Sequence, residues 1–264
     1  MTFRILRNAW TWLAAATVAV GLGGCGLWRP TTVPLRTIAL SGPCAGAVDT
    51  LVVMLPGSYS RPEDYQDEGF VDAARKEGLA VDWLLVDAHV GYYRERSIID
   101  RLHDDVIAPA RAQGYRHIWL AGISIGAFGA MIYAESHPDD IDGVVAIAPY
   151  LGASEMAEQI SAEGGLRQWR APAERPPPDD IDGRLWRWLQ RAVGSDATGP
   201  GRPLFLGYGI DDRFAYSDGV LAAALPSDRV CTAPGGHDWP VWQVLWRHML
   251  TALPLPREAG CAKR

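Results

Sequence analysis

The sequence lacks the features that mark several large classes of protein. It has four cysteines in 264 residues, and no two of them form the C-x-x-C pair of zinc ribbons and thioredoxin-like sites. No Walker loop, dinucleotide fingerprint or metal-ligand motif is present, so we expect no cofactor and no metal. No block of basic residues is dense enough to bind phosphates, and the formal net charge is −6, so nucleic acid is not an expected partner.

The composition that is present is typical of a globular protein. Hydrophobic residues make up 48% of the chain and charged residues 21%, which are ordinary values for folded domains. The 28 glycines and 19 prolines show no repeat, which disfavours collagen-like and low-complexity chains. No internal repeat with a longer period is visible either, which disfavours a solenoid or a propeller. The length fits a single α/β domain.

The N-terminal segment carries charges only at Arg4 and Arg7, before a long apolar run. A charged start followed by an apolar run is typical of an export signal. The run ends in Leu22-Gly23-Gly24-Cys25, which resembles a bacterial lipobox. The resemblance implies a signal peptide over residues 1–24, acylation of Cys25, and a lipid anchor in the bacterial cell envelope, facing the periplasm or at the outer membrane. Two alternatives stay open: a signal peptide with a chance cysteine, and an uncleaved anchor of about membrane length.

Three further cysteines remain after Cys25, namely Cys44, Cys231 and Cys261. An exported chain enters an oxidising compartment, where three cysteines allow one disulfide and one free thiol. We expect Cys44 to pair with Cys261, because the C-terminal tail would otherwise fray. Cys231 is then left as a thiol within a predicted strand.

Short apolar runs alternate with helical patterns along the rest of the chain. This alternation predicts an α/β fold with a mostly parallel central sheet and helices on both faces. We expect strands at Leu51–Leu55, Ala80–Val86, His117–Ala121, Gly143–Ala148, Pro203–Gly207 and Arg229–Thr232. We expect helices at Glu63–Lys76, Arg96–Gln113, Ile125–Ser136, Tyr216–Ala224 and Pro240–Leu250.

The expected organisation is one domain with an insertion. Residues 25–47 are a tether with an edge strand within Val33–Leu40, residues 48–252 form the domain, and residues 253–264 form a tail. Residues 152–202 show no strand pattern, and prolines interrupt any helix in their middle. We expect this insertion to lie over one end of the sheet in the position of a lid, with helices near Ser154–Ala162 and Ile181–Val193.

A possible nucleophile lies in Gly122-Ile123-Ser124-Ile125-Gly126, between a predicted strand and a predicted helix. The G-x-S-x-G pattern alone is a weak signal, but a sharp strand-to-helix turn is the place that a nucleophile elbow requires. The glycines allow the backbone to pass closely there. The start of the helix also directs N–H groups at the place where negative charge would develop.

A serine hydroxyl needs a base, and His237 is the best candidate among six histidines. It lies in a glycine-rich loop between the last predicted strand and the last predicted helix. Ligands of open α/β sheets bind at such carboxyl ends of strands. The other five fit helix, strand or surface positions: His89, His103, His117, His137 and His248.

The third residue of a triad would orient the imidazole. Asp211 and Asp212 both follow the strand Pro203–Gly207, and either could instead cap the next helix. Asp238 is adjacent to His237, and neighbouring side chains usually point apart. Family resemblance, described next, favours Asp212.

The order Ser124, Asp212, His237 on alternating strands resembles the α/β-hydrolase fold, and in particular its serine esterase-like members. The resemblance covers about residues 48–252. It implies an acyl-enzyme mechanism, with Ser124 as nucleophile, His237 as base and Asp212 as its partner, acting on a small ester-like substrate. An acyltransferase or thioesterase with the same triad is one alternative, and a catalytically idle binding protein is another.

The oxyanion hole of such enzymes needs two backbone donors. The resemblance implies the N–H of Ile125 as one of them. The other comes from the loop after an early strand, which here reads Pro56-Gly57-Ser58-Tyr59 instead of the frequent His-Gly. Pro56 has no N–H, so we expect the second donor at Ser58 or at Tyr59.

Aromatic residues supply weaker signals for a substrate pocket. Trp186, in the insertion, could form a pocket wall or a lid over Ser124, although an amphipathic helix that packs its Trp and Leu residues is the simpler interpretation. Tyr59, Tyr92 and Trp239 are further candidates for the pocket rim, and a plain loop or packing role is open for Tyr92 and Trp239.

Overall fold

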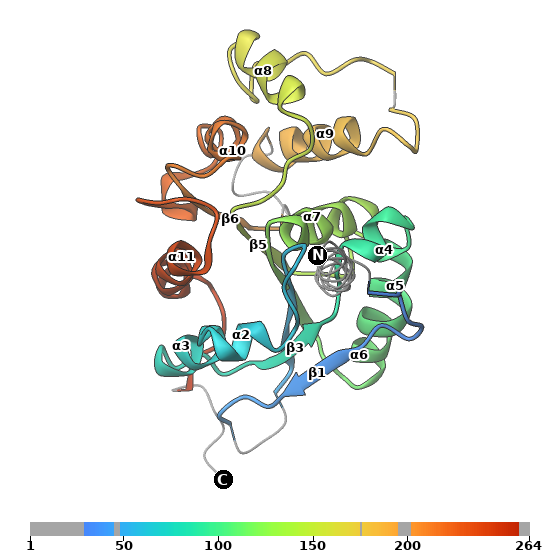
Figure 1. The fold of residues 1–264 in the computed structure, drawn as a ribbon, viewed down its shortest axis with the longest axis vertical. Helices are drawn as coiled ribbons and strands as arrows, with labels where there is room; N and C mark the ends of the chain where they lie inside the picture. The colour runs from blue at the N-terminus through green and yellow to red at the C-terminus, as the bar shows by residue number, and fades with distance from the viewer. Residues whose placement is uncertain (1–28, 45–47, 175, 195–201, 259–264) are drawn as a thin grey trace, which may run out of the picture.

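The computed structural model describes residues 29–44, 48–174, 176–194 and 202–258, and contains a central sheet of seven strands in the order β1-β3-β2-β4-β5-β6-β7 (Figure 1). The strands lie within two residues of the predicted runs, except that β1 is shorter. Their bounds are β1 Thr37–Leu40, β2 Thr50–Leu55, β3 Asp82–Val86, β4 His117–Ile123, β5 Gly143–Ile147, β6 Leu204–Gly209 and β7 Val230–Ala233.

The sheet is parallel except at one edge, as the alternation of strands and helices predicts. Strands β2 to β7 pair in parallel, and β1 pairs antiparallel with β3. Strands β2 and β5 are buried along their whole length. A strand covered on both faces has this continuous apolar character.

Helices cover both faces of the sheet and build two separate hydrophobic clusters. In β2, Val53 and Leu55 belong to one cluster, while Val52 and Met54 belong to the other, because side chains alternate along a strand. Helices α2, α3 and α11 cover one face, and α5 to α7 cover the opposite face (Figure 1). The helices outside the insertion are α2 Asp64–Asp67, α3 Phe70–Lys76, α4 Val90–Arg94, α5 Ile98–Leu102, α6 Ala108–Ala112, α7 Ile125–Ser136, α10 Ala215–Ala222 and α11 Trp239–Ala252.

Two predicted helices are interrupted, and among the α-helices of the described residues α4 was not predicted. The helix expected at Glu63–Lys76 is divided at Gly69, which has a φ of 73°. The helix expected at Arg96–Gln113 contains a π-helical segment, η1, at His103–Ile107. The short helix α4 lies where we expected a loop, and the side chain of His89 caps it by accepting a hydrogen bond from the Gly91 N–H. None of these changes moves a strand.

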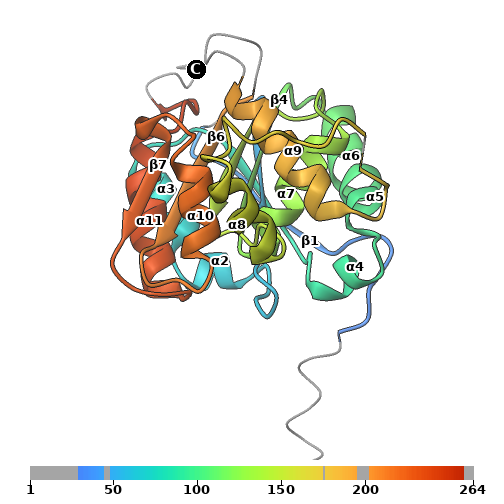
Figure 2. The ribbon, with the colours of Figure 1, turned by 90° about the horizontal axis from the view of Figure 1, so that it is seen from above.

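The insertion contributes two helices, α8 (Ser154–Ala162) and α9 (Ile181–Gly194), close to the expected positions. Helix α8 packs against α10 and α9 packs against α7 (Figure 2). Helix α9 buries Leu185, Trp186 and Leu189 completely, as an amphipathic surface helix does. The insertion therefore shares the hydrophobic cluster of α5 to α7.

The N-terminal stretch enters the fold beside the carboxyl end of β3. Arg29 donates to Asp87 (2.7 Å) and to the backbone carbonyl of Ser60 (3.0 Å). Thr32 and the Tyr92 hydroxyl are also hydrogen-bonded to each other (2.9 Å). The predicted signal peptide and Cys25 lie outside the described residues. Within the described ranges, no helix is both long and apolar enough to span a membrane.

The cysteines agree with the expectation where they are described. Cys44 is disulfide-bonded and Cys231 is a free thiol. Cys261 lies outside the described residues, so its pairing with Cys44 stays a prediction. The described part of the C-terminal tail is fixed to the start of β3, since the Ala80 N–H donates to the Pro256 carbonyl (2.8 Å).

Candidate active site

Ser124 occupies a strained turn between β4 and α7. Its backbone has a φ of 57° and a ψ of −119°, a conformation that costs free energy for a non-glycine residue. The turn is fixed by backbone hydrogen bonds, because the Ser124 N–H donates to the Ile147 carbonyl (2.9 Å) and the Ser124 carbonyl accepts from Phe128 (3.1 Å). Strain that the surrounding structure maintains in this way is frequent at functional sites.

The glycines on either side of Ser124, Gly122 and Gly126, are required because a larger residue would not fit. A Cβ atom at Gly122 would overlap the backbone of Gly126, and one at Gly126 would overlap the Leu55 carbonyl and lie 2.6 Å from the Pro56 carbonyl oxygen. The first turn of α7 therefore packs directly against the end of β2.

His237 and Asp212 complete a chain of hydrogen bonds with Ser124. His237 Nε2 lies 3.0 Å from Ser124 Oγ, and His237 Nδ1 lies 2.7 Å from Asp212 Oδ2. The Asp212 side chain is fully buried and the His237 side chain is 12% exposed. With Asp212 ionised, the Nδ1–H donates to the carboxylate, which leaves Nε2 to accept the serine hydroxyl proton.

The three aspartates that were candidates for the acid make different contacts in the structure. Asp212 contacts His237, and its Oδ1 accepts from the Phe214 N–H (2.9 Å). Asp211 instead accepts from the Gly235 N–H (3.1 Å), which ties the loop after β6 to the loop that carries the histidine. Asp238 caps α11 by accepting from the Val241 N–H.

Two aromatic rings pack against the imidazole of His237. The rings of Phe214 and Trp242 each lie 5.1 Å from that of His237 and nearly perpendicular to it. Edge-to-face contacts of this kind favour one ring orientation. The sequence gave no sign of the contact that Phe214 makes.

A second buried carboxyl group, Asp218 on α10, lies near Asp212. Asp218 is completely buried, and neither carboxyl oxygen has a hydrogen-bond partner in the described part of the chain. Burial raises the pKa of Asp218 well above its ordinary value, and the negative charge of Asp212 raises it further. Both causes favour the uncharged form of Asp218 over the carboxylate.

The two predicted oxyanion donors belong to segments that meet at Ser124. Ile125 is the first residue of α7, where backbone N–H groups have no carbonyl partner within the helix. Ser58 lies in a turn closed by a hydrogen bond from the Ser60 N–H to the Gly57 carbonyl (3.1 Å). A Cβ atom at Gly57 would lie 3.8 Å from the Ser124 Cβ, so this turn is adjacent to the serine.

The aromatic pocket candidates lie in different environments. Tyr59 is 78% exposed. Trp239 is half-buried and makes edge-to-face contacts with Tyr65, Phe70 and Trp242.

Tyr92 and Trp186 correct two of the pocket hypotheses. Tyr92 is 1% exposed, and its hydroxyl bonds to the N-terminal stretch at Thr32. Trp186 has no exposed surface, and its indole N–H donates to the Leu151 carbonyl (3.0 Å). Neither side chain has surface left to form a rim or a lid, because both pack into the apolar cluster of α5 to α7.

Comparison with known proteins gives matches among solved structures only, since no protein-family model and no curated protein matches. Est1E of Butyrivibrio proteoclasticus superposes with a TM-score of 0.55 at 16% identity, over 82% of this chain and 91% of its own. The S-formylglutathione hydrolase FrmB of Staphylococcus aureus superposes with a TM-score of 0.54 at 14% identity, over 85% and 98%.

The fluorophosphonate-binding serine hydrolase FphF of Staphylococcus aureus gives a TM-score of 0.50 at 15% identity, over 83% of this chain and 98% of its own. The chain has the α/β-hydrolase fold. The sheet order, the strained serine after β4 and the loops after β6 and β7 are the parts of this α/β-hydrolase fold that bring Ser124, Asp212 and His237 together.

The close approach at Gly126 makes a testable prediction about stability. We expect Gly126→Ala to lower the free energy of unfolding by about 1–3 kcal/mol, because the new methyl group has to displace the end of β2. Gly219→Ala is the matched control, since a Cβ atom there meets only the Tyr208 hydroxyl at 3.8 Å. Alanine in that helix should raise the free energy by up to about 1 kcal/mol. Urea unfolding measures both variants, and equal effects would contradict the packing argument.

Proposed function

We propose that this protein is a serine hydrolase that cleaves carboxylic esters of small molecules through an acyl-enzyme intermediate. The observation that carries the proposal is the continuous hydrogen-bonded chain from Ser124 Oγ through His237 to Asp212, at 3.0 and 2.7 Å. It is supported by the strained position of Ser124 at the start of α7. Nucleophile, base and orienting acid are the groups that acyl transfer to a serine requires.

In the proposed reaction, Ser124 Oγ attacks the carbonyl carbon while its proton passes to His237 Nε2. Asp212 stabilises the imidazolium that forms. When the tetrahedral intermediate collapses, the bond to the leaving oxygen breaks, and His237 returns the proton so that an alcohol departs. Water then attacks the acyl-enzyme with the same base, which releases a carboxylic acid and regenerates Ser124.

The negative charge on the intermediate would be held by the backbone N–H groups of Ile125 and Ser58. Both lie on segments that the packing at Gly126 and Gly57 places beside Ser124. Fixed donors of this kind stabilise developing charge without a reorganisation step. The N-terminal end of α7 adds a favourable dipole at the same place.

Two solved neighbours support an ester-like substrate. Est1E has been solved with ferulic acid bound, and FphF is a fluorophosphonate-binding serine hydrolase.

Hydrolysis differs from acyl transfer in the acceptor of the acyl group. Product analysis with added alcohols therefore tests the reaction type, because a transferase would form a new ester in preference to the acid.

We further propose that Cys25 carries a lipid that holds the enzyme in the bacterial cell envelope. The support is the lipobox-like Leu22-Gly23-Gly24-Cys25 after a charged start and an apolar run. The disulfide at Cys44 supports an oxidising compartment, since disulfides persist there and are rare in reducing ones.

Covalent labelling tests the nucleophile. We expect a fluorophosphonate probe to label the wild type, not to label Ser124→Ala, and to label His237→Ala at least about a hundredfold more slowly, because the base is lost. Ser154→Ala is the control, because Ser154 is an exposed serine of α8. This variant should be labelled like the wild type. A folded wild type that takes no label would favour a binding protein with a hydrolase fold.

The assignment of the acid makes a second prediction. Asp212→Asn should lower kcat on a p-nitrophenyl ester by about a hundredfold or more, because an amide favours the wrong imidazole tautomer. Asp211→Asn should change kcat by less than about threefold, since an asparagine oxygen can still accept from the Gly235 N–H. The opposite ranking would identify Asp211 as the acid.

Lipid attachment can be measured in a bacterial host fed radioactive palmitate. We expect label on the wild type and on Cys231→Ser, which removes the free thiol, and no label on Cys25→Ser. Label that persists in Cys25→Ser would rule out acylation of this cysteine.

A further inference from the structure

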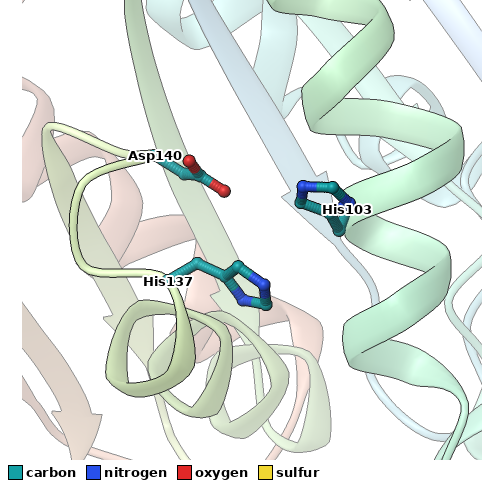
Figure 3. A group of neighbouring side chains, drawn as sticks. All are labelled: His103, His137 and Asp140. Carbon is teal, nitrogen blue, oxygen red and sulfur yellow. The ribbon is translucent and has the colours of Figure 1, made fainter.

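Three potential metal ligands lie together at the end of α7 that is remote from Ser124 (Figure 3). His103 comes from η1, His137 follows the last residue of α7, and Asp140 lies in the turn before β5. One ligand atom from each side chain lies within 4.8 Å of the others. Helix α7 has 12 residues and is about 18 Å long, so this cluster is separate from the candidate active site.

Neighbouring groups orient two of the three side chains. Asp104 Oδ1 lies 2.9 Å from His103 Nδ1, which leaves Nε2 of that ring available. The Tyr133 hydroxyl donates to Asp140 Oδ2 (2.7 Å), which leaves the other carboxylate oxygen available. Carboxylate and hydroxyl partners of this kind fix the ligands of protein metal sites.

His137 provides an independent observation. Its Nδ1 is buried and has no hydrogen-bond partner in the ranges that the structure describes. A buried polar atom without a partner is costly, and each such atom needs an explanation. Coordination through Nδ1 would give this atom the partner that it lacks, whereas coordination through Nε2 would leave Nδ1 without one.

The backbone at His103 is also unusual. The π-helical segment η1 begins at this residue, inside a stretch whose sequence predicts a regular helix. Single π turns within helices occur frequently at functional sites. The π-helical segment therefore begins at a residue of the cluster.

We propose that His103, His137 and Asp140 bind one divalent transition-metal ion of the zinc type. Two imidazoles and a carboxylate, with water in the remaining position, are a ligand set that Zn²⁺ accepts. Tetrahedral ligands of Zn²⁺ are about 3.4 Å apart, so the side chains have to move closer. The His103 side chain is 43% exposed, so the protein leaves room for it to move toward the ion.

This proposal changes the expectation from the sequence that no metal is bound. His103 lies 34 positions before His137, so no local motif marks the site. An ion here would link η1 to the turn between α7 and β5 and would stabilise the native state over the unfolded one.

The same neighbourhood has an explanation without a metal. The rings of Tyr133 and His137 stack at 4.8 Å, and those of His137 and His103 stack at 5.2 Å. Stacking alone would bring the histidines together. The experiment therefore has to separate a metal site from a ring stack only.

Calorimetric titration of the full-length, untagged chain with ZnCl₂ provides the test. We expect one ion per chain, with affinity lowered at least tenfold in His103→Gln and in Asp140→Asn. His117→Gln is the matched control, since His117 is an exposed histidine whose Nδ1 lies 3.4 Å from an aspartate outside the cluster. His237→Gln excludes binding at the triad. Both controls should bind like the wild type.

Two further readouts use the same proteins. A saturating excess of Zn²⁺ should raise the Tm of the wild type and of both controls by about 5 °C or more, but not that of the two cluster variants. Co²⁺ should give the visible absorption bands of a low-symmetry site only where the cluster is intact.

Zn²⁺ affinity that is the same in His103→Gln, Asp140→Asn and the wild type would overturn the proposal and leave the ring stack only. The absence of any saturable binding would overturn it as well. Neither result depends on catalysis, so the metal site and the proposed hydrolase activity fail or stand separately.

Discussion

The close contact between the first turn of α7 and the end of β2 is the constraint on which the candidate site depends. At Gly126 there is no room for even one carbon atom beyond the backbone. The chain can reach this contact only through a sharp turn after β4, and that turn gives Ser124 its positive φ. The same contact places the Gly57–Ser60 turn beside the serine. One packing requirement thus determines the strain at Ser124 and the position of the expected N–H donors.

The opposite half of the site depends on how the loops after β6 and β7 are joined. Asp211 links them twice, since its N–H donates to the Gly235 carbonyl (3.1 Å) and its carboxylate accepts from the Gly235 N–H (3.1 Å). This leaves Asp212 directed at His237. Two adjacent residues of the same type therefore make different contacts, one with the neighbouring loop and one with the imidazole. Burial and the charge of Asp212 both raise the pKa of Asp218 on α10, which disfavours a second negative charge near the imidazole.

Much of the fold could be predicted because strands buried on both faces have a simple sequence pattern. The apolar runs at β2 and β5 are continuous, as in strands that are buried on both faces. Helix α7 begins and ends at the predicted residues, Ile125 and Ser136. The residues of the site followed from chain order at the ends of these strands. The sequence could not separate Asp211 from Asp212 without a family resemblance, because the choice depends on backbone contacts between two loops.

What the sequence could not show depends on contacts between distant segments. Asp218 has the position of an ordinary acid in the first turn of a helix, and only tertiary packing buries it. The sequence left Tyr92 as a rim or loop residue, since nothing local indicates its partner Thr32, which is 60 positions away. The π turn at His103 leaves the apolar periodicity of the segment nearly unchanged, so hydrophobic patterning could not reveal it.

The contacts of Arg29 fix the start of the described chain beside the candidate active site. Arg29 binds the carbonyl of Ser60 and the carboxylate of Asp87, at the carboxyl edge of the sheet where Ser124 also lies. Cys25 precedes Arg29 by four positions in the sequence, and four residues extend at most about 14 Å. In a chain acylated at Cys25, as proposed, so short a connection would hold this edge of the sheet close to the lipid headgroups.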